Sequence, residues 1–400
     1  MDIGERMLVC GTEVGKVEDA ISRICRSYGA ARVDVLSITS SIITTIETPE
    51  GDSITQTRRI ENRTNDLAKI EALNRLSRKI CAEKPAVSEI QEELQKIDSM
   101  KPMRWYFAAL AAIVVAASFT MFFGGSVLDS LAAALVGIVV FTLERYAVRL
   151  KSNKIVFNLL VSIVAGALCI VCWKLGLGQN LDLIMIGVIM LLIPGMAFTG
   201  AIEDLLVGDT ITGVLRLCEA LIAACAIAAG FALSTYVLDA DYVISTPDGE
   251  NWWLPLIMAF VAAAAFGMKL GMKRPLRLLT AGIGGFIGWG AYLLAALILN
   301  DFFSCLIAAT VGAIYAQIMA RVMRAPAAVF LIPAVIPLVP GRALYYTISS
   351  AMHAEPELMS QWGTTAALEA LAIALGMVLV ILAVGAIKSI SRKIKNRKKA

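Results

Sequence analysis

Long apolar runs alternate with short polar loops from residue 105 onward. A transmembrane helix needs about 20 mostly apolar residues, and ten segments come close to that length. They are residues 105–123, 127–143, 155–173, 181–200, 212–238, 252–268, 278–299, 302–320, 327–349 and 364–387. Tryptophans fall near several segment ends, where aromatic side chains collect at membrane interfaces. The pattern predicts about ten transmembrane helices.

The first 104 residues follow a different pattern. Residues 13–28 carry an apolar stripe at helical spacing, which predicts a helix. Residues 32–47 and 53–60 are rich in Val, Ile and Thr, and the turn residues 50–52 separate them, as in two β-like runs. Two more helices are predicted near 64–82 and 87–99. This region is predicted to be a small α+β domain.

Composition and charge agree with this division. The 400 residues are 58% hydrophobic and only 17% charged, whereas soluble domains are about 45–50% apolar and 25% charged. Residues 1–104 hold 16 Lys and Arg and 17 Asp and Glu, so nearly half of all charges lie in the first quarter. These values exclude a disordered chain, a disulfide scaffold and an ordinary soluble enzyme. The net charge of +4 gives no nucleic-acid signal.

The sequence offers little for metal, redox or cofactor chemistry. The N-terminal residues contain no apolar core typical of a signal peptide, so the first domain is expected in the cytoplasm. The eight cysteines are scattered, mostly within apolar runs, and His353 is the single histidine. We therefore expect no disulfide framework, no metal site, no cofactor and no catalytic triad.

Basic residues in the loops predict the orientation. With the first domain inside, the inner loops and the C-terminal tail carry 17 Lys and Arg. The outer side carries only Lys174 and Arg342. Cytoplasmic loops are enriched in Lys and Arg, so ten spans with both termini in the cytoplasm are expected. The inner loop 201–211 is the exception, because it is acidic.

The ten spans show signs of an internal repeat. Leu192-Ile193-Pro194-Gly195 in the fourth span resembles Leu331-Ile332-Pro333 in the ninth, where Pro340-Gly341 follows. A Glu-Ala-Leu stretch then occurs in both the fifth and the tenth span. Because five is odd, two five-helix halves would form inverted repeats, as in many secondary transporters. The predicted domains are residues 1–104, 105–240 and 251–388, with a basic tail at 389–400.

Pro-Gly interruptions point to a binding site near the middle of the membrane. Broken helices expose backbone donors and acceptors that can hold a polar substrate. Pro194, Gly195, Pro340 and Gly341 are therefore candidate substrate-binding positions. The ninth span is expected to be broken, because proline removes a helical hydrogen bond and clashes with the preceding turn.

Several segments resemble the threonine/serine exporter family. They are GTEVGKVEDAISRICRSYG (11–29), GGSVLDSLAAALVG (124–137), LIPGMAFTGAIEDLLVGDTITGVLRLCEAL (192–221) and IPAVIPLVPGRALY (332–345). The resemblance covers nearly the whole chain as one fused protein, whereas split relatives consist of two chains. It implies a multi-pass exporter of the bacterial inner membrane, driven by the proton gradient. Threonine and serine are the implied substrates, and split relatives are linked to succinate.

Charged residues inside the spans are costly and usually functional. Glu219 and Glu369 are candidate proton carriers facing the transport path; the alternative is a helix-end carboxylate bonded to a neighbouring helix. Arg216, one turn before Glu219, could bind a substrate carboxylate or neutralise Glu219. Arg342 is a candidate partner for a substrate carboxylate, or an interfacial cation.

Three acidic residues follow the first Pro-Gly break. Glu203, Asp204 and Asp209 could attract protons or a substrate ammonium group at the cytoplasmic entrance, or form a solvated loop. The prediction as a whole is an α-helical antiporter that exports threonine and serine by alternating access. A dicarboxylate exporter, a channel and a membrane-bound enzyme are the alternatives. The lipid bilayer and protons are expected partners, and self-association into a homo-oligomer is left open.

Overall fold

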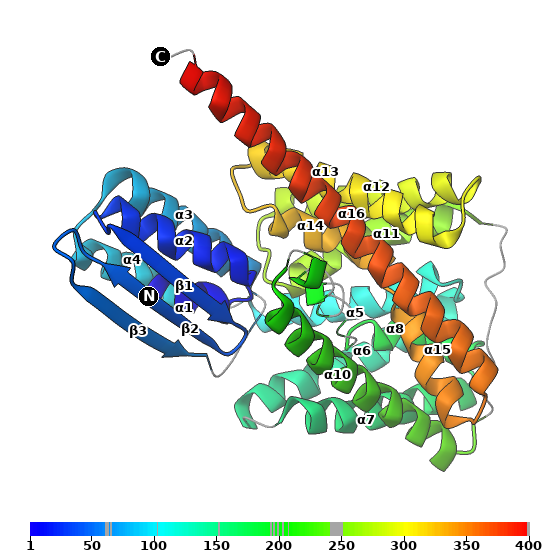
Figure 1. The fold of residues 1–400 in the computed structure, drawn as a ribbon. Helices are drawn as coiled ribbons and strands as arrows, with labels where there is room; N and C mark the ends of the chain where they lie inside the picture. The colour runs from blue at the N-terminus through cyan, green and yellow to red at the C-terminus, as the bar shows by residue number, and fades with distance from the viewer. Residues whose placement is uncertain are drawn as a thin grey trace.

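The computed structural model describes the backbone of most of the chain. The description covers residues 1–397 except residues 61–63, 65, 102, 151–152, 193, 195–196, 198–199, 202–203, 207 and 241–250, with the side chains of 147–150, 154, 352 and 388–397 also left aside. We call residues 1–104 the head and the remainder the membrane body (Figure 1).

The head combines four helices with a small sheet. Its elements are α1 (Asp2–Val9), α2 (Val14–Ser27), β1 (Arg32–Ile38), β2 (Ser41–Glu47), β3 (Ser53–Arg59), α3 (Leu67–Glu83) and α4 (Val87–Asp98). The helices predicted at 13–28, 64–82 and 87–99 are confirmed. Asp66 caps α3, because its side chain accepts hydrogen bonds from the backbone N–H groups of Ala68 and Lys69.

The sheet is an antiparallel meander in the order β1-β2-β3. The single β-like run predicted over 32–47 is two strands, β1 and β2. The chain turns at residues 39–40, and Ile38 then lies opposite Ser41 while Arg32 lies opposite Glu47. Val33 and Ile42 point into the head, whereas β3 is almost entirely exposed. The sheet therefore buries one face, against α2 and its neighbours.

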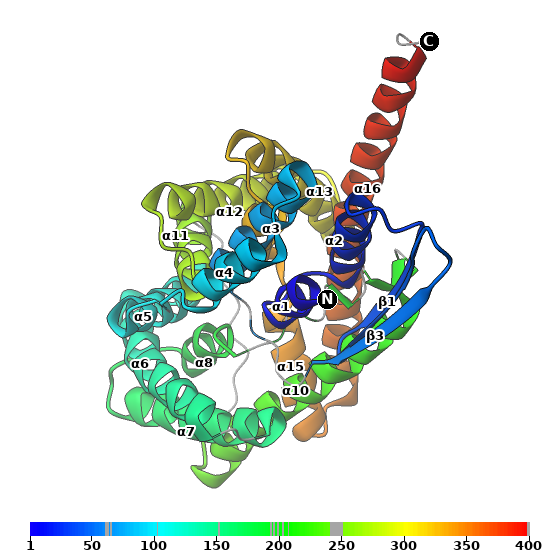
Figure 2. The same ribbon diagram turned by 90° about the vertical axis from the view of Figure 1, so that its left-hand side faces the viewer.

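The membrane body consists of helices packed into a bundle. They are α5 (Trp105–Phe122), α6 (Val127–Leu150), α7 (Lys154–Lys174), α8 (Leu181–Ile189), α10 (Thr210–Val237), α11 (Trp253–Lys269), α12 (Pro275–Ala296), α13 (Asp301–Val322), α14 (Ala328–Val335), α15 (Gly341–Met352) and α16 (Pro356–Arg397). A short 3-10 turn, η1 (Ile336–Leu338), joins α14 to the segment before α15. The last turns of α16 extend beyond the bundle (Figures 1 and 2).

The length of these helices gives fewer spans than the sequence predicts. Within the described residues, seven helices are long and apolar enough to cross a membrane, or eight if a bent pair counts as one span. Of the segment predicted at 181–200, the structure describes α8, with nine residues, and outside α8 it leaves 193, 195–196 and 198–199 undescribed. The segment predicted at 252–268 forms the 17-residue α11. The chain is a multi-pass membrane protein, and the ten-helix inverted repeat stays a prediction.

The ninth predicted segment is broken, as its prolines indicate. Ala328–Leu338 and Gly341–Ala351 are inclined by 48° to each other. Pro333 lies inside α14, Pro337 within η1, and Pro340 is the residue before α15. Proline supplies no N–H for the helical ladder, so three prolines in eight residues prevent a continuous helix.

Small residues allow the helices of the body to approach closely. A Cβ atom on Gly285 of α12 would lie 2.6 Å from the Ala259 carbonyl oxygen of α11. A Cβ on Gly376 of α16 would lie 2.7 Å from the Leu306 carbonyl oxygen of α13. Neither position has room for a larger side chain. Small residues at such contacts are typical of helix packing in membranes.

The head packs directly on one end of the membrane body. Its buried core continues into the body through Leu270, Met272 and Phe330. The Leu67 N–H donates a 3.0 Å hydrogen bond to the Leu270 carbonyl oxygen. Figure 2 views the molecule from the head side, with α3 and α4 lying over the bundle. The two parts therefore share a continuous contact.

Candidate functional site

The two interrupted membrane segments meet inside the bundle. The Tyr346 hydroxyl of α15 donates a 3.0 Å hydrogen bond to the Asp182 carboxylate of α8. Both side chains are buried, with exposed fractions of 1% and 5%. One position earlier, the Tyr345 hydroxyl lies 3.5 Å from the sulfur of Met185. The polar contact thus joins α8 to α15, the helix that follows the break at Pro340.

Arg342 lies one turn before this contact, at the start of α15. Its guanidinium carbon is 5.7 Å from the ring centre of Phe123 and 5.7 Å from that of Trp362. Trp362 in turn lies 4.8 Å, centre to centre, from Tyr346. A guanidinium within about 6 Å of an aromatic ring gains a cation–π attraction. The aromatic rings hold a half-buried cation beside the Asp182–Tyr346 pair.

Glu369 faces the same region from α16. It is half-buried and close enough to Arg342 and Asp301 to interact with them electrostatically. Asp301, the first residue of α13, accepts a 3.1 Å hydrogen bond from the Tyr292 hydroxyl. Arg342 also interacts electrostatically with Tyr346. Arg342 therefore interacts electrostatically both with Tyr346 of the Asp182–Tyr346 pair and with Glu369.

Buried donors without a protein partner occur among the same helices. In the part of the chain that the structure describes, Trp289 Nε1, Trp362 Nε1 and Ser350 Oγ make no hydrogen bond. The Trp289 ring stacks on Tyr292 at 4.5 Å and meets Phe122 edge-on at 4.5 Å. Buried polar groups are normally paired, so these three donors stand out as unsatisfied within the described residues.

The predicted substrate-binding positions have different surroundings. Pro340 and Gly341 are buried at the start of α15 and set the position of Arg342. Pro194 is half-buried, and Gly195 lies outside the described residues. Arg216 does not pair with Glu219 as the spacing suggested. Its Nη1 instead donates a 2.7 Å hydrogen bond to the Asp204 carboxylate.

The predicted acidic positions also differ from one another. Glu219 is exposed on α10, whereas Arg216 is half-buried. Asp204 is buried, and this burial raises its pKa above the usual value, although the charge of Arg216 opposes the rise. Glu203 lies outside the described residues.

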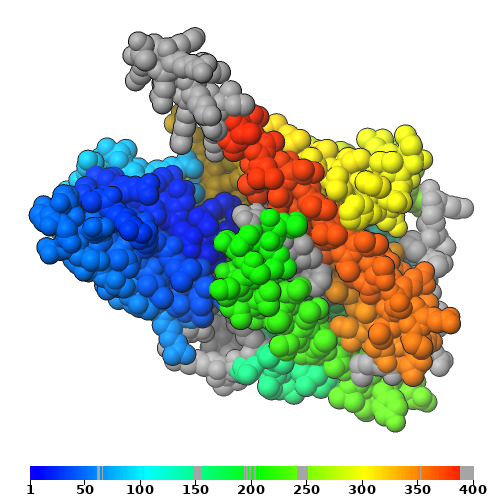
Figure 3. Space-filling view, in the orientation of Figure 1, coloured from blue at the N-terminus to red at the C-terminus, as the bar shows by residue number. Residues whose placement is uncertain are grey.

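Asp209 connects the membrane body to the head. It precedes α10 as its N-cap residue, and its carboxylate lies 3.8 Å from where a Cβ on Gly15 would be. Burial raises the pKa of Glu18 in α2, and the charge of Asp209 raises it further. Figure 3 shows the head, in blue, against the start of α10, in green. Asp209 therefore lies at the junction rather than in an open loop.

Sequence reasoning missed the residues that surround Arg342. Asp182, Tyr346, Trp362 and Trp289 were not singled out, although an ionisable residue opening an apolar run is a usable signal. Asp129, near the start of α6, accepts hydrogen bonds from Ser126 and from the backbone of residues 179–180. No group of three or more His, Cys, Asp or Glu suited to a metal ion occurs among the described residues.

Comparison with known proteins gives consistent matches. A family model for threonine/serine exporters matches residues 1–238, and a second, described as "Threonine/Serine exporter, ThrE", matches residues 255–383. The chain is 25% identical to a "Probable threonine/serine exporter" of Mycobacterium tuberculosis, over 94% of this chain and 73% of that protein. It is 22% identical to a "Threonine/serine exporter" of Corynebacterium glutamicum, over 86% and 73%.

No solved structure matches the chain. The first family model alone spans more than half of the chain, and the second continues through the helices that hold Arg342 and Glu369. The chain therefore belongs to the threonine/serine exporter family.

Proposed function

We propose that this protein exports threonine and serine across the bacterial inner membrane, with the proton gradient as driving force. The observation that carries the proposal is the position of Arg342. It is a half-buried cation between two aromatic rings, next to Glu369 and to the Asp182–Tyr346 pair. The family matches and the relatives' names support the class of substrate.

An amino acid carries one carboxylate, one ammonium group and a short side chain. Arg342 offers a planar fork of N–H donors suited to the carboxylate. Asp182, already hydrogen-bonded to the Tyr346 hydroxyl, offers an acceptor for the ammonium group. The unpaired donors of Trp289, Trp362 and Ser350 can serve the side-chain hydroxyl that threonine and serine share. A site built for a hydroxyl disfavours analogues that lack it.

Glu369 is the carboxylate best suited to carry the coupling proton. It lies within electrostatic range of Arg342, the proposed partner of the substrate carboxylate, so a proton and the substrate ammonium group would compete for the Glu369 carboxylate. The ionised carboxylate would help Asp182 to attract the ammonium group, and protonation on the outer side would release the substrate in exchange for the proton. Glu219 is less suited, because no hydrogen bond or ion pair of its carboxylate occurs within the described residues.

Alternating access would use the bent segment. α14 and α15 are inclined by 48°, and Arg342 lies immediately beyond the break. Rocking of α15 and α16 against α8 would expose the site to opposite sides in turn. In this arrangement the head and the basic end of α16 lie in the cytoplasm, as the loop charges indicate.

Efflux from proteoliposomes tests the proposal. Vesicles loaded with threonine, serine or succinate are compared with and without an imposed proton gradient. Gradient-dependent, saturable efflux of threonine and serine is expected, and preference for succinate would favour a dicarboxylate exporter. Gradient-independent, non-saturable flux would favour a channel. Efflux of all three substrates unchanged by the gradient would overturn the proposal.

Matched variants test the site itself. Arg342→Gln is expected to raise KM for threonine, and Arg321→Gln, at an exposed arginine on α13, is the control. Glu369→Gln is expected to abolish the gradient dependence of efflux. Glu357→Gln, at an exposed glutamate on α16, should leave it intact. Wild-type gradient dependence in Glu369→Gln would exclude Glu369 as the proton carrier.

A further inference from the structure

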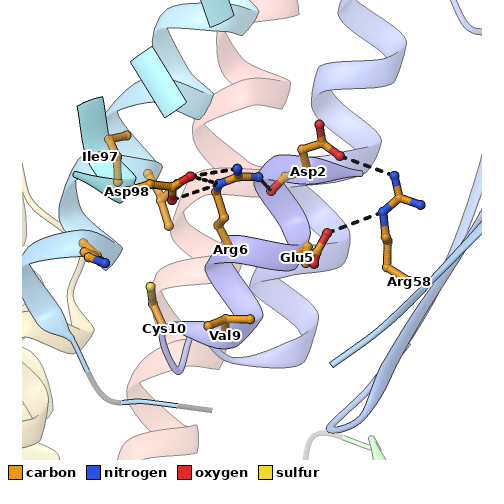
Figure 4. A pocket seen from close by; sticks show the side chains of 10 residues that line it. Asp2, Glu5, Arg6, Val9, Cys10, Arg58, Ile97 and Asp98 are labelled. Carbon is orange, nitrogen blue, oxygen red and sulfur yellow. Dashed lines mark hydrogen bonds and ion pairs between the residues drawn. The ribbon is translucent and has the colours of Figure 1, made fainter. Parts of the chain in front are cut away.

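The head contains a cavity that the transport site does not use. It has a volume of about 410 Å³ and lies between α1, α3, α4 and β3 (Figure 4). Three cationic side chains, three carboxylates and several apolar side chains line it. The lining residues are Asp2, Glu5, Arg6, Val9, Cys10, Arg58, Lys69, Leu73, Ile97 and Asp98.

One pair of these charges is satisfied within the protein. Arg6 binds the Asp98 carboxylate through Nε and Nη2 at 2.9 and 2.8 Å. Its Nη1 donates to the Asp2 carbonyl oxygen at 3.1 Å. This arrangement ties α1 to α4 and forms one side of the cavity, as Figure 4 shows. Arg6 and Asp98 therefore have little capacity left for a ligand.

The remaining charges are not satisfied in this way. Arg58 forms long ion pairs with Asp2 at 3.6 Å and Glu5 at 3.4 Å, and both distances are beyond normal hydrogen-bond length. Within the described residues, neither Arg58 nor these two carboxylates makes a side-chain hydrogen bond to another. The half-buried Lys69 has no ion-pair partner there either. Lys69 and the loosely ion-paired Arg58, Asp2 and Glu5 thus line the cavity with hydrogen-bonding capacity to spare.

These four charged groups define the ligand chemistry. Arg58 and Lys69 can bind a carboxylate, because both offer several N–H donors and permanent charge. Asp2 and Glu5 can accept from an ammonium group. The charges balance, so a neutral zwitterion fits better than a net anion. Val9, Leu73 and Ile97 provide an apolar wall for a small side chain. We propose that this cavity is a second binding site for a free α-amino acid.

The cavity is connected to the membrane body through α3. Lys69 and Leu73 line the cavity, while Glu71, between them in sequence, forms an ion pair with Arg277 of α12. Leu67 of the same helix bonds to Leu270. A ligand at Lys69 therefore stabilises the helix that docks the head on the body. The site gives the exporter a means of responding to the amino-acid concentration on the side of the head.

This inference goes beyond the proposed transport function and does not depend on it, since the head would bind its ligand even in a protein that transports nothing. Hydrogen–deuterium exchange on the full-length protein in detergent tests it locally. The probes are L-threonine, L-serine, succinate and inorganic phosphate. The amino acids should slow exchange in peptides covering residues 1–10 and 67–76, with saturation. Succinate and phosphate should not.

Two variants and a control define the outcome. Lys69→Gln and Arg58→Gln should each raise the half-saturating threonine concentration for this protection by about tenfold or more. Lys79→Gln, at an exposed lysine on the same helix, should not change it. Because Arg58 is partly exposed on β3, its variant should fold even if the other does not. No protection by either amino acid, equal protection by succinate or phosphate, or unchanged protection in both variants would overturn the proposal.

Discussion

The ion pair between Glu71 and Arg277 should dominate the docking of the head. Its carboxylate and guanidinium are nearly enclosed, with side-chain exposures of 16% and 8%. Glu71 Oε1 accepts a 2.5 Å hydrogen bond from Arg277 Nη2, and Arg277 Nε has no partner within the described residues. Replacing Glu71 would therefore leave a buried guanidinium with almost no compensation.

The magnitude follows from the burial. Removing one member of a buried pair costs about 3–5 kcal/mol, whereas replacing both by apolar side chains is often neutral. Because Glu71 keeps some exposure, we take the lower end, about 3 kcal/mol. The chain of 400 residues exceeds the size for which 1 kcal/mol shifts Tm by about 2–4 °C, so Glu71→Met or Arg277→Met should lower the apparent Tm by up to about 6 °C.

A double-mutant cycle in detergent measures the coupling. Thermal unfolding is followed for both single variants, for the double variant and for Glu83→Gln, an exposed glutamate on α3. The double variant should recover most of the loss, and the single variants should make the segment before residue 105 more sensitive to protease. A Tm for Glu71→Met no lower than that of Glu83→Gln would refute the reasoning.

Three further predictions concern other parts of the molecule. Tyr346→Phe removes the hydroxyl that donates to the buried Asp182 carboxylate and should raise KM for threonine by about tenfold, measured by efflux; an unchanged KM would separate this pair from the substrate site. Gly376→Val places a side chain against the Leu306 carbonyl oxygen and should reduce folded protein in the membrane, measured by size-exclusion chromatography, whereas Gly385→Ala, in open space, should not. Burial raises the pKa of Cys10 to about 11, so maleimide labelling should be slow at pH 8 and accelerate toward pH 11. Because the folded protein favours the neutral Cys10 thiol, its burial stabilises the fold below the unfolded-state pKa, and this stabilisation is lost as pH rises through about 11. Fast labelling of Cys10 in the folded protein at pH 8 would contradict the raised pKa.

The sequence predicts the elements better than the site. Span positions follow from apolar length, and the break in the ninth segment follows from Pro333, Pro337 and Pro340. The nine-residue length of α8 was not predictable, because residues 181–192 are uniformly apolar apart from Asp182. Helix ends inside such a run depend on packing against other segments, which local sequence does not encode.

The candidate site illustrates the same limit. Arg342 is predicted as a site residue because it is a rare cation next to a Pro-Gly break. Its neighbours Phe123, Trp362 and Glu369 come from three other parts of the chain, and only tertiary packing brings them together. Arg216 shows that spacing along one helix can also predict the wrong partner. Spacing suggested Glu219 as its partner, yet Asp204 lies closer once the chain before α10 folds back.

Direct measurement of proton movement tests the central claim most closely. Proteoliposomes that enclose a pH-sensitive dye are given an outward threonine gradient at equal pH on both sides. The account predicts that threonine efflux drives protons into the vesicles, and that Glu369→Gln abolishes this acidification while Glu357→Gln retains it. Threonine efflux without any change in internal pH in the wild-type protein would contradict proton-coupled export.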